Sequence, residues 1–345
     1  MTLFINDWPV LDQPTGIGVY AQSIFPALEH FPHHLAGGAG GRASLSARLN
    51  RLCWSQFGLP HEAASQGASL IFTPAPEGYL GPQSIPQVVM VHDLRPISHP
   101  ERSFQSLYFR FWVPPLLRCC QHVITNSRFT AGEIQRCIGL PEDRITVIPL
   151  GYDRRAFYPT TDQQQVQPYL LHVGQAYPHK NLRRLIVAFS AVAKCHPDVI
   201  LLLAGKSHPT ESPALQRLVA EFGLQRRVIF RPYVPPAELP DLYRGALALV
   251  YPSLWEGFGL PILEAMASGT PVLTSLGSGT QDVAGDAALL IDPTNTAMLQ
   301  EGLGALLQQP SIREQMRQRG LQRATLFDWS RTAEQTAAVI ERFLV

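Results

Sequence analysis

Short runs of hydrophobic residues, most of them ending in small or polar residues, recur along the whole chain. Such runs are typical of strands that are covered on both faces of a parallel sheet. In the first half of the chain they lie at residues 3–6, 69–73, 87–92, 122–126 and 145–150. In the second half they lie at residues 169–173, 199–204, 228–230, 246–251, 271–274 and 287–291.

Amphipathic segments with apolar residues at helical spacing separate these runs. In the second half they are residues 181–195, 214–222, 237–243, 261–267 and 296–307. Strand–helix alternation, twice over, predicts an α/β protein with two doubly wound, Rossmann-like domains. The polar, proline-flanked segment 157–168 is typical of a linker. We therefore expect domains over residues 1–165 and 166–328, followed by a terminal amphipathic helix over residues 329–345.

The composition narrows the classes of function. Of the 345 residues, 46% are hydrophobic and 16% are charged, which predicts a folded globular protein. The net charge of +1 argues against a nucleic-acid partner, which favours a basic surface. The chain has three lysines, Lys180, Lys194 and Lys206, all in its second half.

The N-terminal segment and the cysteines favour a cytoplasmic location. The chain begins without the basic and apolar regions of a signal peptide, and no run of about 18 apolar residues occurs. The five cysteines are scattered, as expected for reduced thiols. Residues 103–121 are rich in aromatic residues and arginines, so peripheral contact with the inner face of a membrane stays open. The competing interpretation of this segment is a core helix broken at Pro114-Pro115.

Two motifs match nucleotide-binding fingerprints only in part. Gly16 and Gly18 open a G-x-G-x-x-A motif, but no acidic strand end follows about 20 residues later, as a dinucleotide would need. Residues 204–207 lack the earlier glycine of a P-loop. Two glycines at a helix start still let a ligand approach the backbone closely. No zinc pattern occurs, and the doublet His33-His34 falls in an expected loop.

The segment PSLWEGFGLPILEAMASGTPV, residues 252–272, carries the most informative chemistry. It follows a strand and predicts a glycine-rich turn, a helix, a second turn and another strand. The N–H groups of the first turn and of the helix start form an anion site. Glu256 in the turn and Glu264 in the helix face the same strand-end crevice. A phosphate held by backbone leaves both carboxylates for hydroxyl groups, a combination that fits a nucleotide sugar.

This segment resembles the E-x7-E signature of family 4, the retaining glycosyltransferases of the GT-B fold. The rest of the chain is similar to the family almost end to end. The matching segments are TGIGVY at 15–20, VHDL at 91–94, TNS at 125–127, PLGYD at 149–153, VGQAYPHKNL at 173–182, FRPYV at 230–234 and VAGDAA at 283–288. The overall pattern is most similar to mannosyltransferases and related enzymes of surface polysaccharide assembly.

The resemblance implies donor-binding roles in the second domain. Glu264 would bind the ribose hydroxyls, and Glu256 would hold hydroxyls of the transferred sugar. Lys180 would neutralise the diphosphate, with Lys206 as a second cation. Backbone groups at two further turns would line the donor, at Phe258, Gly259, Leu260, Tyr233 and Val234.

The resemblance also assigns the first domain to the acceptor side, across a cleft from the donor domain. Gly16 and Gly18 would close on the diphosphate, and His92 would lie against the reacting sugar. The implied catalytic residues are thus Glu256, His92 and Lys180. Asp93 is interpreted as structural, capping the turn after its strand. The terminal helix would pack back on the first domain, as in relatives.

The implied reaction is transfer of a hexose from a nucleoside diphosphate sugar to a saccharide or lipid-linked saccharide, with retention. GDP-mannose is the first donor to consider, and neither a metal nor another cofactor is expected. Gln175 stands where many relatives have an arginine in the phosphate loop. One alternative is therefore a non-catalytic nucleotide-sugar-binding protein. Another is a nucleotide-sugar epimerase on the same fold, which would need its own acid and base carboxylates.

Overall fold

The computed structural model describes residues 1–7, 16–35, 45–81, 84–100, 103–160 and 167–344. Its contacts divide the chain into two units, Met1–Gly151 with Asp328–Val345, and Tyr152–Phe327. The first boundary therefore precedes the one expected at residue 165. Arg154 explains part of this difference, because its Nη2 donates to the carbonyls of Thr325 (3.2 Å) and Phe327 (3.3 Å) in the second unit. The linker residues 161–166 lie outside the described part of the chain.

The first unit is built on a six-stranded parallel sheet in the order β2-β1-β3-β4-β5-β6. The strands are β1 (Leu3–Ile5), β2 (His33–Leu35), β3 (Leu70–Thr73), β4 (Gln87–Val91), β5 (His122–Thr125) and β6 (Ile145–Val147). The loop expected at His33-His34 is wrong, because both histidines belong to β2. Among the described strands, β2 is at the edge of the sheet and pairs with β1, so its polar side chains can face water.

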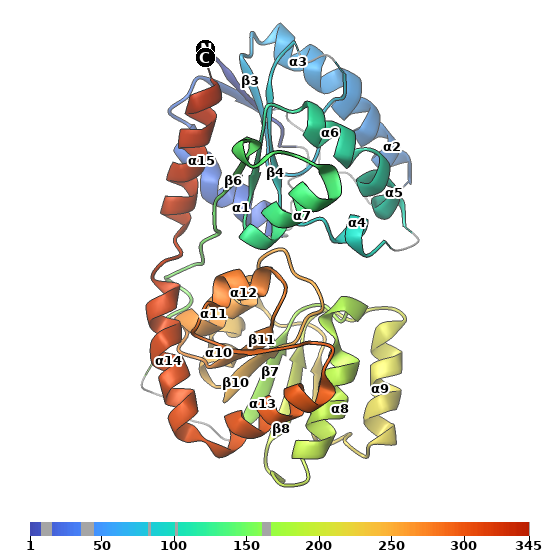
Figure 1. The fold of residues 1–345 in the computed structure, drawn as a ribbon, viewed down its shortest axis with the longest axis vertical. Helices are drawn as coiled ribbons and strands as arrows, with labels where there is room; N and C mark the ends of the chain where they lie inside the picture. The colour runs from blue at the N-terminus through green and yellow to red at the C-terminus, as the bar shows by residue number, and fades with distance from the viewer. Residues whose placement is uncertain (8–15, 36–44, 82–83, 101–102, 161–166, 345) are drawn as a thin grey trace. The chain divides into compact units, whose positions relative to one another are not determined.

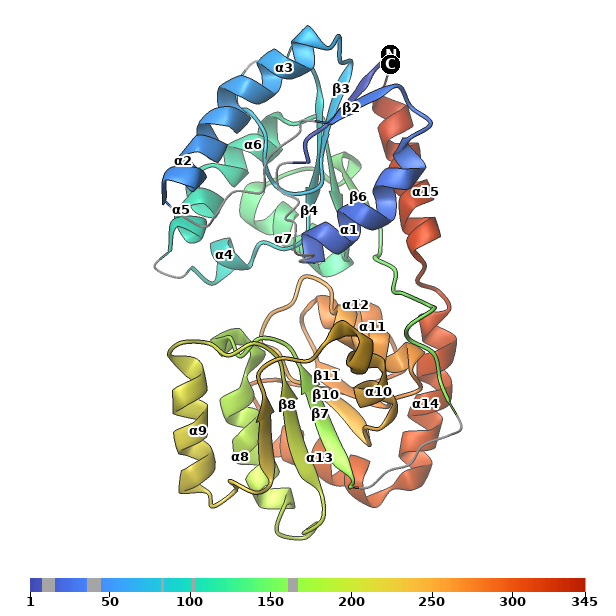
Figure 2. The same ribbon diagram turned by 180° about the vertical axis from the view of Figure 1, so that it is seen from behind.

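Helices cover both faces of this sheet (Figures 1 and 2). They are α1 (Gly16–Ile24), α2 (Leu45–Cys53), α3 (Leu59–Ser65), α4 (Arg95–Ser98), α5 (Phe104–Phe111), α6 (Val113–Cys119), α7 (Arg128–Ile138) and α15 (Trp329–Phe343), with the short turns η1 (Phe25–Leu28), η2 (Trp54–Gly58) and η3 (Glu142–Arg144). The terminal helix α15 packs beside α1 on one face, whereas α2, α3, α5 and α6 lie on the other.

The aromatic-rich segment 103–121 forms two helices, and the expected break at Pro114-Pro115 is misplaced. The chain turns at Trp112, and the prolines lie in the first turn of α6, where a missing N–H costs little. Leu116 and Leu117 of α6 are fully buried, while Leu107 and Phe111 of α5 are 57% and 66% exposed. The segment is therefore core on α6 and partly solvent-facing on α5. Within the described residues, no helix is both long and apolar enough to cross a membrane.

The second unit has its own six-stranded parallel sheet, in the order β12-β11-β10-β7-β8-β9. Its strands are β7 (Tyr169–Val173), β8 (Ile200–Ala204), β9 (Val228–Arg231), β10 (Ala248–Tyr251), β11 (Val272–Ser275) and β12 (Leu289–Ile291). The first three strands run outward from β7 in one direction, and the last three run outward from β10 in the other. With this second sheet, the expected pair of doubly wound α/β folds is confirmed.

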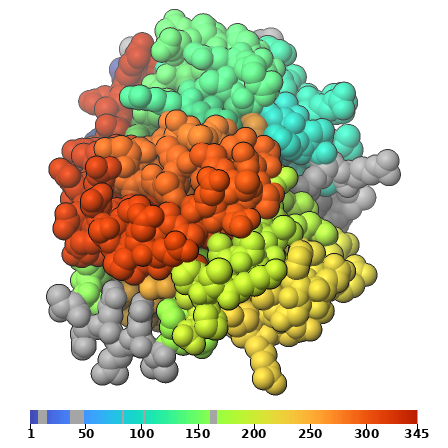
Figure 3. Space-filling view, turned by 60° about the horizontal axis from the view of Figure 1, so that its bottom comes forward, coloured from blue at the N-terminus to red at the C-terminus, as the bar shows by residue number. Residues whose placement is uncertain are grey.

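The helices of the second unit complete its layers. They are α8 (Leu182–Val192), α9 (Glu211–Glu221), α10 (Leu239–Arg244), α11 (Leu260–Ala267), α12 (Gly279–Ala284), α13 (Thr296–Gln308) and α14 (Pro310–Ala324), with η4 (Pro178–Lys180) and η5 (Pro236–Glu238). Helices α14, α13, α8 and α9 follow one another across a continuous surface (Figure 3). The buried core beneath includes Leu185 and Phe189 of α8 and Leu303 of α13.

Candidate functional site

The centre of the second sheet is a topological switch point. Strands β7 and β10 are neighbours, yet the chain leaves them toward opposite edges of the sheet. The loops after two such strands diverge and leave a crevice at their carboxyl ends, where ligands of open α/β sheets bind. Lys180 follows β7 and Glu256 follows β10, so the sheet order brings both residues to this crevice.

Lys180 and Glu256 form a buried ion pair there. Lys180 Nζ donates to Glu256 Oε1 and to the Tyr251 hydroxyl, both at 2.6 Å. The two charged side chains are only 11% and 15% exposed. From the sequence, Lys180 is expected to contact the diphosphate and Glu256 the transferred sugar. Their direct contact with each other is not predictable from the sequence.

The pair keeps both groups charged despite burial. Burial alone disfavours the ammonium, but Glu256 and Tyr251 outweigh it and raise the pKa of Lys180 above its usual value. Burial likewise opposes the carboxylate, but Lys180 outweighs it and holds the pKa of Glu256 below its usual value. A cation fixed by two acceptors still has one N–H left for a ligand.

Two glycines keep the strand ends beside Lys180 open. At Gly174, an added Cβ would lie 3.6 Å from Lys180 Cε and 3.8 Å from Nζ, so the space beside the ammonium is free of side chain. At Gly205, an added Cβ would lie 2.1 Å from the Gly174 carbonyl oxygen, so only glycine lets the loops after β7 and β8 approach this closely. The Gly174 φ of 150° further favours glycine.

Asn181 joins three loops around the ion pair. It has a left-handed backbone (φ 61°), and its Nδ2 donates to the carbonyls of Pro252 (3.0 Å) and Pro293 (2.7 Å). Its Oδ1 accepts a bond from Arg184 Nη1 (2.8 Å). Asn181 thereby fixes the turn that aims Lys180.

Asn181→Ala should lower the free energy of unfolding by about 3 kcal/mol, because the buried Pro252 carbonyl loses its Asn181 donor, the Pro293 carbonyl is left with Arg184 as its donor, and a Cβ residue must adopt a left-handed backbone. Asn181→Gly should lose only the hydrogen-bonding part, about 2 kcal/mol. Urea denaturation of both variants measures the difference. Two variants as stable as the wild type would mean that Asn181 does not hold the loops together.

Glu264 lies on α11 and is paired with a tyrosine. Its Oε2 accepts a bond from the Tyr243 hydroxyl at 2.8 Å. Burial raises the pKa of Glu264 to about 7, with the tyrosine bond opposing the shift. Near neutral pH this carboxyl is therefore divided between a protonated form and a carboxylate that can accept two hydroxyl hydrogens.

Three further predicted donor residues lie at the same edge of the sheet. Phe258 and Gly259 precede α11 and Leu260 begins it, so their N–H groups belong to a helix start. The preceding loop is anchored by Gly279 N–H, which donates to the Glu256 carbonyl (2.9 Å).

Lys206, Tyr233 and Val234 follow the two strands that lie outside β7, namely β8 and β9. Lys206 follows β8 and is exposed, and its carbonyl accepts a bond from Ala176 N–H (3.2 Å). Tyr233 and Val234 follow the edge strand β9, and Tyr233 is 73% exposed. The structure therefore brings Lys180 and Glu256 into direct contact, whereas these three residues follow strands farther from the switch point.

His92 lies in the first unit, directly after β4. Its Nε2–H donates to the Pro74 carbonyl at 2.9 Å, and the ring meets Tyr20 of α1 edge-on at 5.1 Å. Burial lowers the pKa of His92 to about 4, so the ring is neutral at pH 7 and its Nδ1 is an acceptor. Gly16 and Gly18 lie in the first turn of α1, whose preceding residues 8–15 are outside the described part of the chain.

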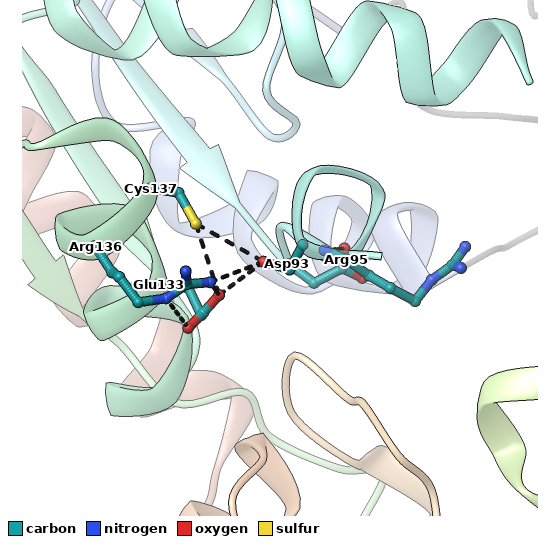
Figure 4. Close-up of polar contacts among 6 residues, drawn as sticks. Asp93, Arg95, Glu133, Arg136 and Cys137 are labelled. Atoms are coloured by element: carbon teal, nitrogen blue, oxygen red, sulfur yellow. Dashed lines mark hydrogen bonds and ion pairs between the residues drawn. The ribbon is translucent and has the colours of Figure 1, made fainter. Parts of the chain in front are cut away.

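A polar cluster joins α4 to α7 (Figure 4). Ser98 Oγ donates to Glu133 Oε2 (2.8 Å) and accepts from Arg136 Nη2 (3.2 Å). Asp93 Oδ1 accepts from Arg95 N–H (3.1 Å), which confirms the structural role expected for Asp93 at this turn. The Arg95 side chain extends away from the cluster (Figure 4).

Three residues of the site were missed from the sequence: Tyr251, Tyr243 and His172. Tyr251 is the last residue of β10, and the rule that functional residues follow strand ends could have found it. Tyr243 lies inside α10, with no local signal of its contact with Glu264. His172, inside β7, is a buried polar residue in a hydrophobic run. No three His, Cys, Asp or Glu side chains gather as a metal site among the described residues.

Two family models match most of the chain. The model described as Glycosyltransferase Family 4 matches residues 19–156, and the model described as Glycosyl transferases group 1 matches residues 155–323. The division between these matches falls close to the boundary between the two units.

Individual relatives agree with the models. The chain is 33% identical, over 65% of its length, to O-antigen chain mannosyltransferase RfbU of Salmonella typhimurium. It is 35% identical, over 62% of its length, to O-antigen chain mannosyltransferase B of Escherichia coli. It spans 62% and 58% of the lengths of these relatives. Among solved structures, sucrose-phosphate synthase from Thermosynechococcus elongatus superposes with a TM-score of 0.80 at 21% identity, covering 99% of this chain and 98% of that one, which shows a shared fold.

Proposed function

Because the chain belongs to the glycosyltransferases described by these two family models, we propose that it transfers a hexose from a nucleoside diphosphate sugar to a saccharide or lipid-linked saccharide. The anomeric configuration is retained, as is typical of the family. GDP-mannose is the first donor to test, with mannose as the transferred sugar, because both relatives named above are mannosyltransferases. The observation that carries the proposal is the Lys180–Glu256 pair at the switch point of the second sheet.

Lys180 promotes departure of the nucleoside diphosphate. Its ammonium is buried and charged, and it lies beside Gly174, which carries no side chain. A preorganised cation in a water-poor site stabilises the charge that develops on the leaving phosphate. The leaving phosphate then takes the proton of the attacking acceptor hydroxyl, so no protein nucleophile is required.

Glu256 serves the transferred sugar. With one oxygen on Lys180, the carboxylate keeps lone pairs that accept sugar hydroxyls. Its negative charge also stabilises positive charge that develops on the sugar ring as the glycosidic bond breaks. On the acceptor side, the neutral His92 ring offers Nδ1 as an acceptor for a sugar hydroxyl.

Glu264 binds the ribose diol, and its titration should be visible in binding. With a pKa of about 7, the carboxyl becomes the better hydroxyl acceptor as pH rises from 6 to 8. The affinity ratio of GDP over 2′-deoxy-GDP should therefore rise several-fold across this range, because the ratio cancels titrations elsewhere. Isothermal titration calorimetry measures both ligands, and Glu264→Gln should make the ratio independent of pH. An affinity ratio that does not change with pH in the wild type would show that Glu264 does not bind the ribose.

The proposal includes neither a metal nor an organic cofactor, and no nucleic-acid partner. The cation at the diphosphate is the protein's own Lys180. A cytoplasmic location, with peripheral contact at the inner face of a membrane, remains part of the proposal. The exposed Leu107 and Phe111 of α5 support such a contact.

Release of nucleoside diphosphate separates this function from its alternatives. A transferase incubated with donor and acceptor turns over and yields a glycoside. A non-catalytic binder retains the donor intact, and an epimerase converts it to another nucleotide sugar. Chromatography of the nucleotide pool after incubation distinguishes all three, and either of the last two outcomes would contradict the proposal.

A further inference from the structure

His172 has one ring nitrogen without a partner, although the residue is fully buried. It lies in β7, and its Nδ1–H donates to the Val250 carbonyl of β10 at 3.0 Å. A carbonyl can only accept, so this bond leaves Nε2 as a bare lone pair. Nε2 is buried and has no hydrogen-bond partner. An orphaned acceptor in a core is costly and calls for a physical explanation.

The ring also supports the ion pair of the site. It stacks on Tyr251 with ring centroids 5.3 Å apart and planes 13° from parallel. Tyr251 in turn accepts a hydrogen bond from Lys180 Nζ. His172 therefore holds Tyr251 from behind while Tyr251 holds the ammonium.

Nε2 and the ammonium lie beside the same glycine, Gly174. A Cβ added at Gly174 would lie 3.5 Å from His172 Nε2 and 3.8 Å from Lys180 Nζ. An anion bound against Gly174 would therefore lie close to both the lysine and the histidine. The lysine suits an anionic oxygen, whereas the bare lone pair repels one unless the imidazole is protonated.

We propose that His172 is a positioning residue for the donor diphosphate: it holds Lys180 through Tyr251, and its Nε2 takes up a proton from solvent when the diphosphate binds. The second positive charge then stands beside Gln175, where the phosphate loop itself supplies a neutral side chain. This inference rests on the proposed function, because it takes the ligand to be a nucleoside diphosphate.

The charges around His172 fit a proton that is taken up only with ligand. Burial lowers the pKa of His172 to about 4, with the Val250 bond and Glu256 opposing this shift and Lys180 adding to it. The titratable groups that face the ring are Lys180, Glu256 and Tyr251. The β8 residue paired with His172 is the apolar Leu203. An incoming diphosphate adds negative charge, which favours the imidazolium.

Calorimetry counts this proton. GDP and UDP are titrated into the full chain at pH 6 in two buffers of different ionisation enthalpy. The wild type should take up at least about half a proton more per bound nucleotide than His172→Phe, which keeps a stacking ring without nitrogen. His172→Phe should also bind about tenfold more weakly. Proton release from Glu264 is common to both proteins and cancels in the difference.

Two further variants sharpen the test. His196→Phe is the matched control, because His196 Nε2 is also buried without a partner but precedes β8 at the opposite end of the sheet. It should leave affinity and proton count unchanged. Adding Gln175→Arg to His172→Phe should restore affinity through a permanent charge, without restoring proton uptake.

A measurement on the wild type alone covers the case in which His172→Phe does not fold. In two-bond ¹H–¹⁵N spectra, GDP should convert one histidine from the neutral Nδ1–H form to the imidazolium. The inference about His172 would be overturned if wild type and His172→Phe took up equal numbers of protons on binding nucleotide, or if no histidine gained a proton in these spectra. The proposed function would be unaffected by either result. Failure of the wild type to bind GDP or UDP would overturn the proposed function, and this inference with it.

Discussion

Lys180→Met should lower kcat/KM for the donor by about a thousandfold, because one preorganised charge at a leaving phosphate contributes on this scale. Methionine preserves most of the side-chain volume but removes the charge. The buried Glu256 carboxylate would lose its ion-pair partner Lys180, so its pKa should rise above the usual range. Donor affinity and turnover should both fall, because the ammonium acts on the diphosphate in the ground state and in the transition state.

Lys194→Met is the matched control for this substitution. Lys194 is exposed and belongs to the same unit, so its loss should leave kinetics and stability unchanged. Lys180→Arg adds a test of shape, since a planar guanidinium does not fit where a compact ammonium lies 2.6 Å from two oxygens. Turnover of Lys180→Met within twofold of the wild type would show that the cation is only structural.

Glu256→Gln should lower kcat by about a hundredfold while leaving GDP affinity unchanged or improved. The amide cannot stabilise positive charge on the sugar, which explains the loss of rate. It also no longer neutralises Lys180, which explains why GDP should not bind more weakly. This opposite behaviour of rate and affinity distinguishes Glu256→Gln from Lys180→Met.

A double variant tests whether the two residues act as one unit. Lys180→Met with Glu256→Gln should be hardly slower than Lys180→Met alone, because effects of directly paired residues are not additive. Glu211→Gln is the control, since Glu211 pairs with the exposed Arg183 at the surface of the same unit. Equal kcat for Glu256→Gln and wild type, or strictly multiplicative losses, would contradict the role given to Glu256.

The strands were predictable because buried parallel strands leave continuous hydrophobic runs. The run at residues 169–173 coincides with β7, and the run at 122–126 differs from β5 by a single residue. The edge strand β2 was not predictable, because His33 and His34 pair through backbone and need no hydrophobic side chains. Pro114-Pro115 misplaced a helix break, because prolines end one helix and begin another with equal ease.

The site was predictable as a set of strand-end residues but not as a set of contacts. Lys180 and Glu256 each follow a strand, and a hydrophobic run carries that information. Their pairing depends on β7 and β10 being neighbours in the sheet, although 74 residues lie between the end of β7 and the start of β10.

 That strand order cannot be predicted from the local sequence, so the ion pair between Lys180 and Glu256 becomes visible only in the folded sheet.

The partners of Glu264 and Lys180 illustrate the same limit. Tyr243 reaches Glu264 from α10, a helix whose own pattern indicates nothing beyond packing. His172 occupies a position in β7 that pattern alone assigns to the core, and its orphaned nitrogen becomes visible only with its neighbours in place.

Assay of nucleoside diphosphate release across a donor panel tests the central claim most directly. GDP-mannose, UDP-glucose and UDP-N-acetylglucosamine are incubated with wild type and Lys180→Met, each with free and lipid-linked saccharide acceptors. We expect the wild type to release GDP from GDP-mannose and to form an α-linked product, and Lys180→Met to do so about a thousandfold more slowly. Wild-type protein that binds GDP but releases no nucleoside diphosphate from any donor would contradict the account.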